Sequence, residues 1–256
     1  MNLGALLAGK TVFITGASSG IGAHLARVSA ACRANVVIAA RRMDDLRAME
    51  DDLFKRGAKG VLSLRLDVAN EDDCRAALTQ ARETFGAIDA LVNNAGVAGD
   101  AMAIDMKIAD YDRILDVNLR GAFVLSQEAA RAWRDGKRGG VIVNVASVLG
   151  YRQAGGVSAY AISKAGVVQM TKILAYEWAR YGIRVNALAP GYFDTAMNEG
   201  FFDTDPGKAM IRRIPMRRVG DLADLDGPFL LLATDASRFM TGATIPVDGG
   251  HLVASL

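Results

Sequence analysis

The sequence predicts a doubly wound α/β fold, in which residues 1–256 form a single domain around a parallel sheet of about seven strands with helices on both faces. Two observations predict this fold. Short apolar runs rich in β-branched residues alternate with amphipathic helical patterns along the chain. The first run, at 12–14, leads at once into a cluster of glycines and then into a helix, as a Rossmann-like fold begins.

Each element follows from its own pattern. The predicted strands cover residues 12–14, 35–39, 61–66, 90–92, 141–145, 184–189 and 243–247. The predicted helices begin near residue 21 and then cover 44–56, 71–84, 109–133 and 159–181. Sheets of this kind bind ligands at the carboxyl ends of their strands, where the strand order reverses. We therefore expect a binding site just after the first strand.

Three glycines, Gly16, Gly20 and Gly22, stand between the first strand and the first helix. A strand, a glycine-rich loop and a helix N-terminus together present free backbone N–H groups and a positive helix end to a phosphate. The spacing Gly-x-x-x-Gly-x-Gly differs from the commonest dinucleotide fingerprint. The alternative is therefore a tight turn that only packs the helix onto the sheet.

Composition argues against several classes of function. The net charge of +2 gives no reason to expect a nucleic acid partner. Cys32 and Cys74 are expected to be reduced thiols, and neither His24 nor His251 has a neighbour at metal-ligand spacing, so no metal is expected. No apolar run approaches the ~20 residues that span a bilayer. Residues 1–8 do not resemble a signal peptide, so we expect a cytoplasmic protein with no membrane partner.

A long segment at about 191–220 interrupts the alternation of strands and helices. Its aromatic and methionine side chains would suit the apolar body of a substrate: Tyr192, Phe193, Met197, Phe201 and Phe202. Its place after the carboxyl end of a strand favours a lid over a bound ligand. The alternative is a pair of helices that merely covers the sheet.

Tyr160 and Lys164 stand four residues apart in a predicted helix and therefore share a face. A free tyrosine has a pKa of about 10, and a nearby ammonium would lower it, which would make Tyr160 a general acid/base tuned by Lys164. Ser147, at the carboxyl end of a strand, is suited to hold a substrate carbonyl oxygen. For the Tyr160–Lys164 pair the alternative is a solvated helix face.

Together these motifs resemble those of the short-chain dehydrogenase/reductase family, over nearly the whole chain. The matching pieces, in the family's order and close to its spacing, are Thr15-Gly-Ala-Ser-Ser-Gly-Ile-Gly22, Asp67-Val68, Asn93-Asn-Ala-Gly96, Asn118, Ser147, Tyr160-x-x-x-Lys164, Pro190-Gly191 and Val247-Asp-Gly-Gly250. The resemblance implies an NAD(P)-dependent oxidoreductase that interconverts a ketone and a secondary alcohol.

The resemblance also implies a role for each matching position. Ser147 would polarise the substrate oxygen, Tyr160 would transfer the proton, and Lys164 would tune Tyr160 and bind the nicotinamide ribose. Asn118 would position a water that links Lys164 to solvent. The residues implied in cofactor binding are Gly16, Ser18, Ser19, Gly20, Ile21, Gly22, Asp67, Val68, Asn94, Ala95, Gly96, Tyr160, Lys164, Pro190, Gly191 and Thr195.

The end of the second predicted strand favours NADP over NAD. An acidic residue there would bind the adenosine ribose hydroxyls and repel a 2′-phosphate, but this chain has Ala40, followed by Arg41 and Arg42. A guanidinium binds phosphate bidentately and stacks on adenine, so we expect Arg41, with Arg42 as the less certain partner, to select NADP. The alternative is that both arginines are solvated or paired with Asp44 or Asp45.

The expected substrate is a small carbonyl or alcohol compound with an apolar body. The pairs Arg212-Arg213 and Arg217-Arg218 leave open a 3-oxoacyl thioester on an acidic carrier, or they form a solvated basic patch. A cofactor-sensing protein without chemistry is disfavoured, because all three catalytic side chains are present. By analogy with the family, a homotetramer or homodimer would form through the predicted helices 109–133 and 159–181.

Two positions affect the helices rather than the site. Arg33 stands where the family commonly has a glycine at the end of the first helix, so we expect a left-handed conformation there, at a cost of about 1 kcal/mol. Gly227-Pro228 is expected to restart a helix, because a proline in a helix interior would break it.

Overall fold

The computed structural model describes residues 3–195 and 200–254, and within them seven parallel strands form one sheet. The strands are β1 (Thr11–Thr15), β2 (Asn35–Ala40), β3 (Gly60–Arg65), β4 (Ala90–Asn93), β5 (Gly140–Val145), β6 (Ile183–Pro190) and β7 (Thr244–Val247). Their order in the sheet is β3-β2-β1-β4-β5-β6-β7, so the order reverses between β1 and β4. The predicted doubly wound parallel sheet is confirmed.

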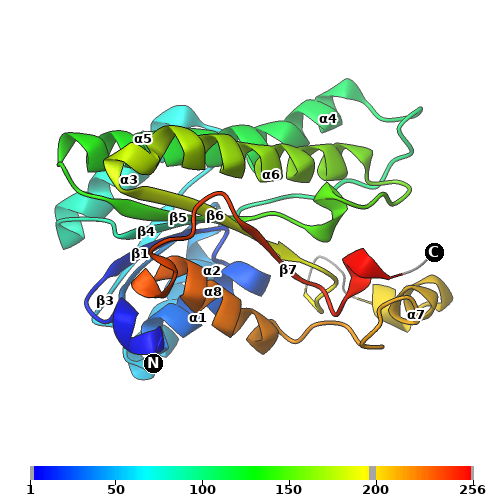
Figure 1. Cartoon of the computed structure of the whole chain (residues 1–256), viewed down its shortest axis with the longest axis horizontal. Coiled ribbons are helices and arrows are strands. Elements are labelled where there is room, and N and C mark those ends of the chain that lie inside the picture. Colours follow the sequence, from blue (N-terminus) through cyan, green and yellow to red (C-terminus); the bar gives the residue numbers. More distant parts are fainter. Residues whose placement is uncertain (1–2, 196–199, 255–256) are drawn as a thin grey trace.

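Helices cover both faces of this sheet (Figure 1). One face carries α1 (Gly20–Ala31), α2 (Met43–Arg56) and α8 (Asp226–Ala233), and the other carries α3 (Glu71–Phe85), α5 (Gly121–Asp135) and α6 (Ser158–Trp178). Successive residues of β1 enter opposite layers, since Val12 and Ile14 pack with the first group and Phe13 with the second. Because β1 is buried on both faces, its middle residues 12–14 are all apolar, as the sequence indicated.

The predicted helix at 109–133 is a helical run with a change in its middle. It starts as α4 (Ile108–Leu115), passes through a π-helical turn at Asp116–Arg120 and continues as α5. The turn escapes the sequence pattern, because one wider turn barely disturbs the spacing of the apolar residues. Turns of this kind are frequent at functional sites, and Asn118 lies in this one with its side chain buried.

Both expectations about helix ends are confirmed. Arg33 has φ +61°, in the left-handed region, directly after α1 and Cys32. Pro228 lies in the first turn of α8, where its missing N–H costs no helical hydrogen bond. Between β6 and α8 the chain forms a further helix, α7 (Asp205–Ile211), whose N-terminus is capped by the side chain of Thr204.

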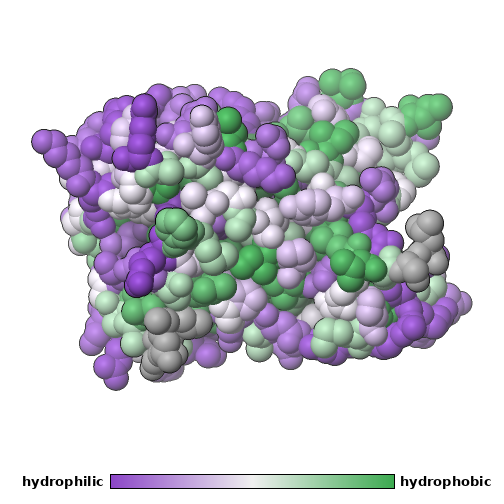
Figure 2. Space-filling view, viewed as in Figure 1, coloured by the Kyte–Doolittle hydropathy of each residue, from purple (hydrophilic) through white to green (hydrophobic). Residues whose placement is uncertain are grey.

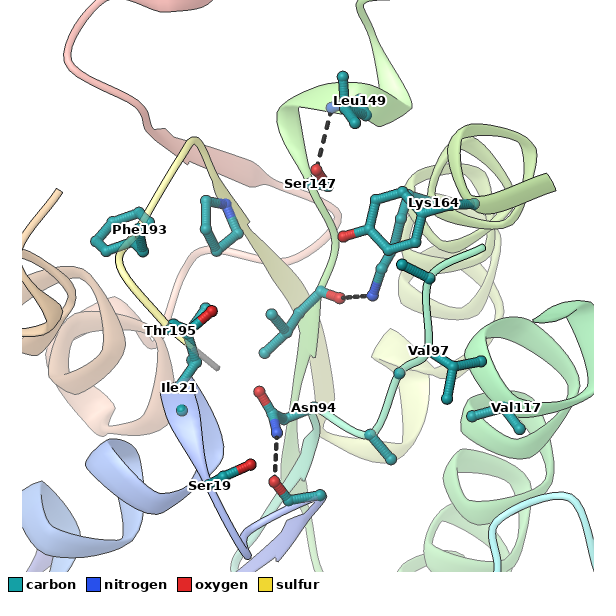
Figure 3. Close-up of a pocket in the computed structure, with 18 of the residues that line it drawn as sticks. Ser19, Ile21, Asn94, Val97, Val117, Ser147, Leu149, Lys164, Phe193 and Thr195 are labelled. Carbon is teal, nitrogen blue, oxygen red and sulfur yellow. Dashed lines mark hydrogen bonds between the residues drawn. The ribbon is translucent and has the colours of Figure 1, made fainter. Parts of the chain in front are cut away.

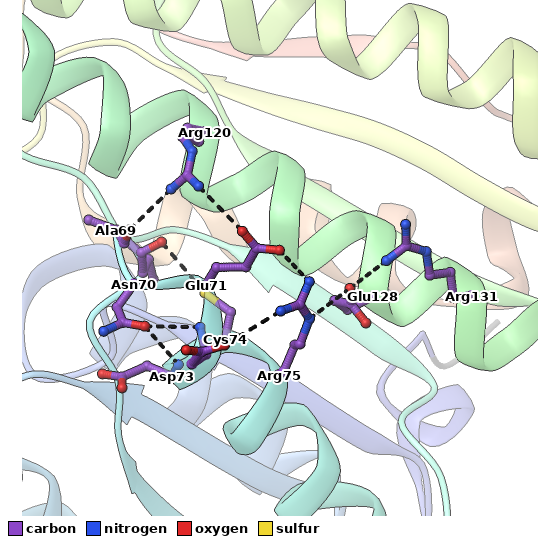
Figure 4. A network of polar contacts seen from close by, with 11 residues as sticks. Ala69, Asn70, Glu71, Asp73, Cys74, Arg75, Arg120, Glu128 and Arg131 are labelled. Carbon is purple, nitrogen blue, oxygen red and sulfur yellow. Dashed lines mark hydrogen bonds and ion pairs between the residues drawn. The ribbon is translucent and has the colours of Figure 1, made fainter.

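A chain of ion pairs fastens the start of α3 to the helix that contains the π turn (Figure 4). Glu71 pairs with Arg75, and Arg75 in turn reaches Glu128 on α5 at 3.4 Å. Arg120 lies 3.5 Å from Glu71 and also donates to the backbone carbonyl of Ala69 at 3.2 Å. Exposed pairs of this kind contribute little to stability, because water and salt screen them. Their clearer effect is geometric, because they hold the loop after β3 beside the mouth of the site described below.

None of the helices in residues 3–195 and 200–254 is both long enough and apolar enough to cross a membrane. Figure 2 shows hydrophobic side chains near the end of the molecule that bears α4, and Met102, Ile104 and Ile108 are exposed in that part of the chain.

Both cysteines are free thiols. Burial raises the pKa of the Cys74 thiol to about 12, which leaves it unreactive at neutral pH.

Candidate active site

A cavity of about 990 Å³ opens at the carboxyl ends of the strands, around the point where the strand order reverses (Figure 3). Its size is at the upper end of ordinary ligand sites, about 300–1,000 Å³. The predicted site residues that line it are Gly16, Ser18, Ser19, Gly20, Ile21, Arg41, Arg42, Asp67, Val68, Asn94, Ala95, Gly96, Ser147, Tyr160, Lys164, Pro190, Gly191, Tyr192, Phe193, Thr195 and Phe201.

The glycine loop begins at a position that only glycine fills easily. Gly16 has φ +63°, and a Cβ there would lie 2.8 Å from the Cα of Ala95. Gly22 does not line the cavity. A side chain at Gly22 would overlap the Gly16 carbonyl and the Asn94 side chain. Gly22 therefore allows α1 to approach the loop, which is the packing role that the sequence left as an alternative.

Thr15 joins the loop after β1 to the loop after β4, a role that the sequence reading missed. Its Oγ1 accepts from the backbone N–H groups of Asn94 and Ala95, both at 3.0 Å, and donates to the Val92 carbonyl at 3.3 Å. The Asn94 side chain donates to the carbonyls of Thr15 at 2.9 Å and Gly16 at 3.1 Å. A hydroxyl residue at the end of a buried strand, just before a glycine loop, was the signal available in the sequence.

The two arginines after β2 differ in their surroundings. Arg42 Nε lies 2.8 Å from Asp45 Oδ2, and Arg42 also donates to Ser18 Oγ at 3.2 Å. Arg41 is exposed and lines the cavity, and no ion pair engages it in the described part of the chain. The expected alternative, pairing with Asp45, thus holds for Arg42 only.

Ser147 and Tyr160 meet at the other end of the cavity. Ser147 Oγ accepts from the Leu149 N–H at 3.1 Å, which leaves the Ser147 hydroxyl hydrogen free to donate. Burial raises the pKa of Tyr160, and a side-chain hydrogen bond with Ser147 acts in the opposite direction. At neutral pH the phenol therefore carries its proton.

Lys164 comes from the same face of α6 as Tyr160, with its Nζ 5.6 Å from the centre of the tyrosine ring. The amine is buried, which lowers the pKa of Lys164 to about 8, and it donates to the Val145 carbonyl at 2.7 Å (Figure 3). The pKa of Tyr160 is raised, opposite to the expected lowering, and desolvation of the phenol is the largest cause.

Asn118 lies behind the cavity rather than on its surface. Its Oδ1 accepts from the Val97 N–H at 2.8 Å, and its Nδ2 donates to the Val97 carbonyl at 2.9 Å and to Ser163 Oγ at 3.0 Å. These bonds occupy both amide hydrogens of Asn118. The side chain therefore ties the π turn to the loop after β4 and to α6.

The aromatic and methionine residues predicted to contact the substrate differ in their positions. Tyr192 and Phe201 line the cavity, as expected. Phe193 also lines it but is only 3% exposed and belongs to the core, because Gly220 and its neighbours pack over the ring. Phe202 lies outside the lining and packs edge-on against Tyr192, with ring centres 6.5 Å apart. Met197 lies outside the described residues.

Several lining residues were not foreseen, and they come from the loops after β3, β4 and β5, the last residue of β5 and the π turn. They are Leu66, Val97, Ala98, Gly99, Asp100, Val117, Val145, Ala146, Val148, Leu149, Ala154, Gly155 and Val157. Their mostly apolar, small side chains resemble core residues in sequence, so only the fold identifies them as cavity walls. Ala40, which was expected at the adenosine end, also lines the cavity. No cluster of three or more His, Cys, Asp or Glu side chains suited to a metal occurs within residues 3–195 and 200–254.

Comparisons with known proteins find similarity over nearly the whole chain. Residues 16–251 match the family model described as enoyl-(acyl carrier protein) reductase. A 3-oxoacyl-(acyl-carrier-protein) reductase of Rickettsia felis is 35% identical over 247 residues, which are 96% of this chain and 98% of that protein. The crystal structure of a short-chain type dehydrogenase/reductase from Mycobacterium marinum has a TM-score of 0.91 at 39% identity, covering 96% of this chain and 97% of that one.

A gluconate 5-dehydrogenase from Burkholderia cenocepacia, solved in complex with NADP and tartrate, has a TM-score of 0.94 at 35% identity, and each chain is covered over 100% of its length. The likeness extends over the glycine loop, α6 and β7 alike. The chain therefore belongs to the short-chain dehydrogenase/reductase family and is an oxidoreductase.

Proposed function

We propose that this enzyme uses NADP(H) to interconvert a ketone and a secondary alcohol, with Tyr160 as the general acid/base. The observation that carries the proposal is a shared cavity, in which a glycine loop at a helix N-terminus and the Ser147, Tyr160 and Lys164 side chains meet. The same observation speaks against a non-catalytic cofactor sensor, because such a protein has no need to gather these three groups.

The residues present fit a bound dinucleotide. Gly16 and Gly191 allow the Ala95 and Asp248 backbones to approach closely beside the cavity, because a Cβ at either glycine would lie 2.8 Å from the Cα of Ala95 or Asp248, respectively. Gly16, Ser18, Ser19, Gly20 and Ile21 would hold the phosphates, since free N–H groups and the positive end of α1 face that part of the cavity. Asp67 and Val68 would contact the adenine. Asn94, Ala95 and Gly96 would line the ribose side, and Pro190, Gly191 and Thr195 would face the nicotinamide.

A bound nicotinamide supplies or accepts the hydride. Tyr160 carries its proton at neutral pH and would deliver it to the carbonyl oxygen during reduction. Ser147, whose oxygen already accepts from Leu149, would donate its own hydrogen to the same substrate oxygen. Lys164 has further N–H groups beyond the one bonded to Val145 and would bind the nicotinamide ribose.

The preference for NADP rests on the adenosine end of the cavity. β2 ends at Ala40, so no carboxylate stands there to repel a 2′-phosphate, and the exposed Arg41 guanidinium is without an ion pair among the described residues. A guanidinium suits a phosphate because its parallel N–H groups match two phosphate oxygens. The NADP in the Burkholderia relative supports the same choice.

An apolar substrate body is supported by the walls around Ser147, which include Val148, Leu149 and Tyr192. The second candidate is a 3-oxoacyl thioester, favoured by the likeness to the Rickettsia reductase. Of the arginines that would contact an acidic carrier, Arg218 is engaged by Asp224 at 2.6 Å, which weakens its part in such a contact. Arg212 and Arg213, which follow α7, would then contact the carrier.

Residues 191–220 are proposed to act as a lid, because Tyr192 and Phe201 from this segment line the cavity. Association into a homodimer or homotetramer is also proposed. It is supported by large apolar side chains that α5 and α6 expose, with Phe123 40%, Ile162 50% and Ile173 44% exposed.

The test of the proposal is a steady-state screen of the purified enzyme. Aliphatic and cyclic ketones, hydroxy acids and 3-oxoacyl thioesters are each offered with NADPH and with NADH, and cofactor oxidation is followed by absorbance. Turnover of a ketone with NADPH at a higher kcat/KM than with NADH supports the proposal. Turnover of thioesters alone selects the second candidate, and no turnover with any carbonyl contradicts both.

A further inference from the structure

A carboxylate outside the cavity engages one of the two arginines at its adenosine end. Asp45, in the first turn of α2, lies 2.8 Å from Arg42 Nε, and Arg42 donates to Ser18 Oγ at 3.2 Å. Ser18 and Arg42 line the cavity, whereas Asp45 does not. The Arg42 side chain therefore reaches from α2 to the glycine loop and is occupied at both ends of its guanidinium.

Arg41, directly beside it, has neither contact. Two adjacent arginines at the same end of the cavity thus differ in how free their charge is. A phosphate near Arg41 would find an available guanidinium, but near Arg42 it would have to compete with the Asp45 carboxylate and the Ser18 hydroxyl. A carboxylate and a phosphate compete for the N–H donors of a guanidinium, so binding of one displaces or weakens binding of the other.

We propose that Asp45 is a specificity-determining residue for the cofactor, which weakens binding of the 2′-phosphorylated form by holding Arg42. The inference rests on the proposed cofactor site, with the adenosine ribose beside Arg41 and Arg42. Asp45 acts in two ways, since it withholds a cation from the phosphate and adds a negative charge within a Debye length of it. The unphosphorylated cofactor has a hydroxyl in place of the 2′-phosphate, so neither effect acts on it at this position.

The size of the effect follows from exposure. The side chains of Arg42 and Asp45 are 64% and 43% exposed, so water and salt screen their attraction and a phosphate can break it. Removal of a single such pair changes an equilibrium about twofold to fivefold. Asp45 therefore adjusts the ratio of NADPH to NADH affinity, and does not decide by itself which cofactor binds.

The test compares Asp45→Asn with Asp44→Asn in the full-length enzyme. Asp44 lies beside Asp45 in the same helical turn, is exposed, and makes no ion pair with Arg42. Each variant loses one charge and the same interaction with the helix dipole. Dissociation constants for NADPH and NADH are measured by fluorescence titration, and 2′,5′-ADP and 5′-AMP repeat the comparison without the nicotinamide.

Asp45→Asn is expected to tighten NADPH and 2′,5′-ADP about twofold to fivefold, with NADH and 5′-AMP unchanged and a smaller effect in Asp44→Asn. Equal effects in the two variants would overturn the proposal. Weaker NADPH binding in Asp45→Asn would also overturn it, because Asp45 would then orient Arg42 toward the phosphate.

Arg42→Ala and the Arg42→Ala/Asp45→Asn double variant test the holding of Arg42. Without Arg42, the Asp45→Asn gain is expected to shrink to that of Asp44→Asn, and a gain that persists in full contradicts the role of Arg42. The proposed preference for NADP over NAD is tested independently of the role of Asp45. Tighter NADH than NADPH binding by the unaltered enzyme would contradict that preference, while the Asp45 and Asp44 variants would still decide the role of Asp45.

Discussion

Lys164 Nζ donates a hydrogen bond to the backbone carbonyl of Val145, at a distance of 2.7 Å, from a buried position beside Tyr160. The carbonyl belongs to the last residue of β5, two residues before Ser147. The bond therefore links the helix that carries Tyr160 and Lys164 to the strand end that carries Ser147. This hydrogen bond of the buried amine therefore helps to hold the three proposed catalytic groups in place relative to one another.

Replacement of Lys164 by Met is expected to abolish turnover without lowering stability at pH 7. The folded pKa of about 8 lies below the ordinary 10.5, so below pH 8 the buried charge costs about 3 kcal/mol, less about 1 kcal/mol for the bond to Val145. The folded form releases its proton first, so this penalty fades as the pH rises from about 8 toward 10.5.

Urea unfolding at pH 7 and at alkaline pH measures this difference in the free energy of unfolding. The matched control is Lys172→Met, an exposed position on the same helix, which is expected to change neither stability nor turnover. A Lys164→Met variant less stable than the unaltered enzyme at pH 7 would contradict the account.

Tyr160→Phe is expected to lower kcat by about 10² to 10⁴, while the dissociation constant for NADPH changes little. The ring remains and only the titrating oxygen is lost. Tyr176→Phe, on the same helix and 83% exposed, is the control and should behave like the unaltered enzyme. Substantial turnover by Tyr160→Phe at saturating substrate would show that another group transfers the proton.

The two directions of the reaction are expected to differ in their pH dependence. Burial raises the pKa of Tyr160, so the proton donor needed for reduction is present throughout the neutral range, whereas the phenolate needed for oxidation increases with pH. Reduction should decline above about pH 8, as Lys164 loses its charge in the free enzyme. Profiles of kcat/KM in each direction measure this, and an oxidation rate independent of pH across that range would be the contrary result.

Arg41→Ala is expected to weaken NADPH far more than NADH, because the guanidinium has only the 2′-phosphate to distinguish the two cofactors. Ala40→Asp should shift the preference toward NADH by adding a carboxylate at the end of β2. Arg47→Ala, exposed on α2 and away from the cavity lining, controls for the loss of a positive charge. Equal losses for both cofactors in Arg41→Ala would remove Arg41 from the site.

Hydrogen exchange tests the proposed lid. Backbone amides in the 191–220 segment are expected to exchange faster in the free enzyme than in a complex with cofactor and substrate, whereas those of β4 and β5 should be slow in both. Phe193 and Gly220 pair across the base of this segment, so the change should be confined between them. Exchange equally slow in both states would mean that the segment is a fixed wall.

Much of the site was readable in advance because its residues follow strand ends. In a parallel sheet all carboxyl ends meet at one edge, so a glycine loop after β1, Ser147 after β5 and Pro190-Gly191 at the end of β6 are brought together by topology alone. The helical spacing of Tyr160 and Lys164 then sets their common face. The roles of these residues remain predictions that the variants above address.

The sequence by itself determined the order of strands and helices, the glycine loop and the set of chemical groups at the site, because local pattern and strand periodicity decide these. Only the tertiary structure decided which neighbour each group meets. It gave Lys164 the Val145 carbonyl as a partner, closed the core over Phe193, and placed Asp45 against Arg42. The raised pKa of Tyr160 belongs to the same class, since it is caused by burial, which the tertiary structure decides.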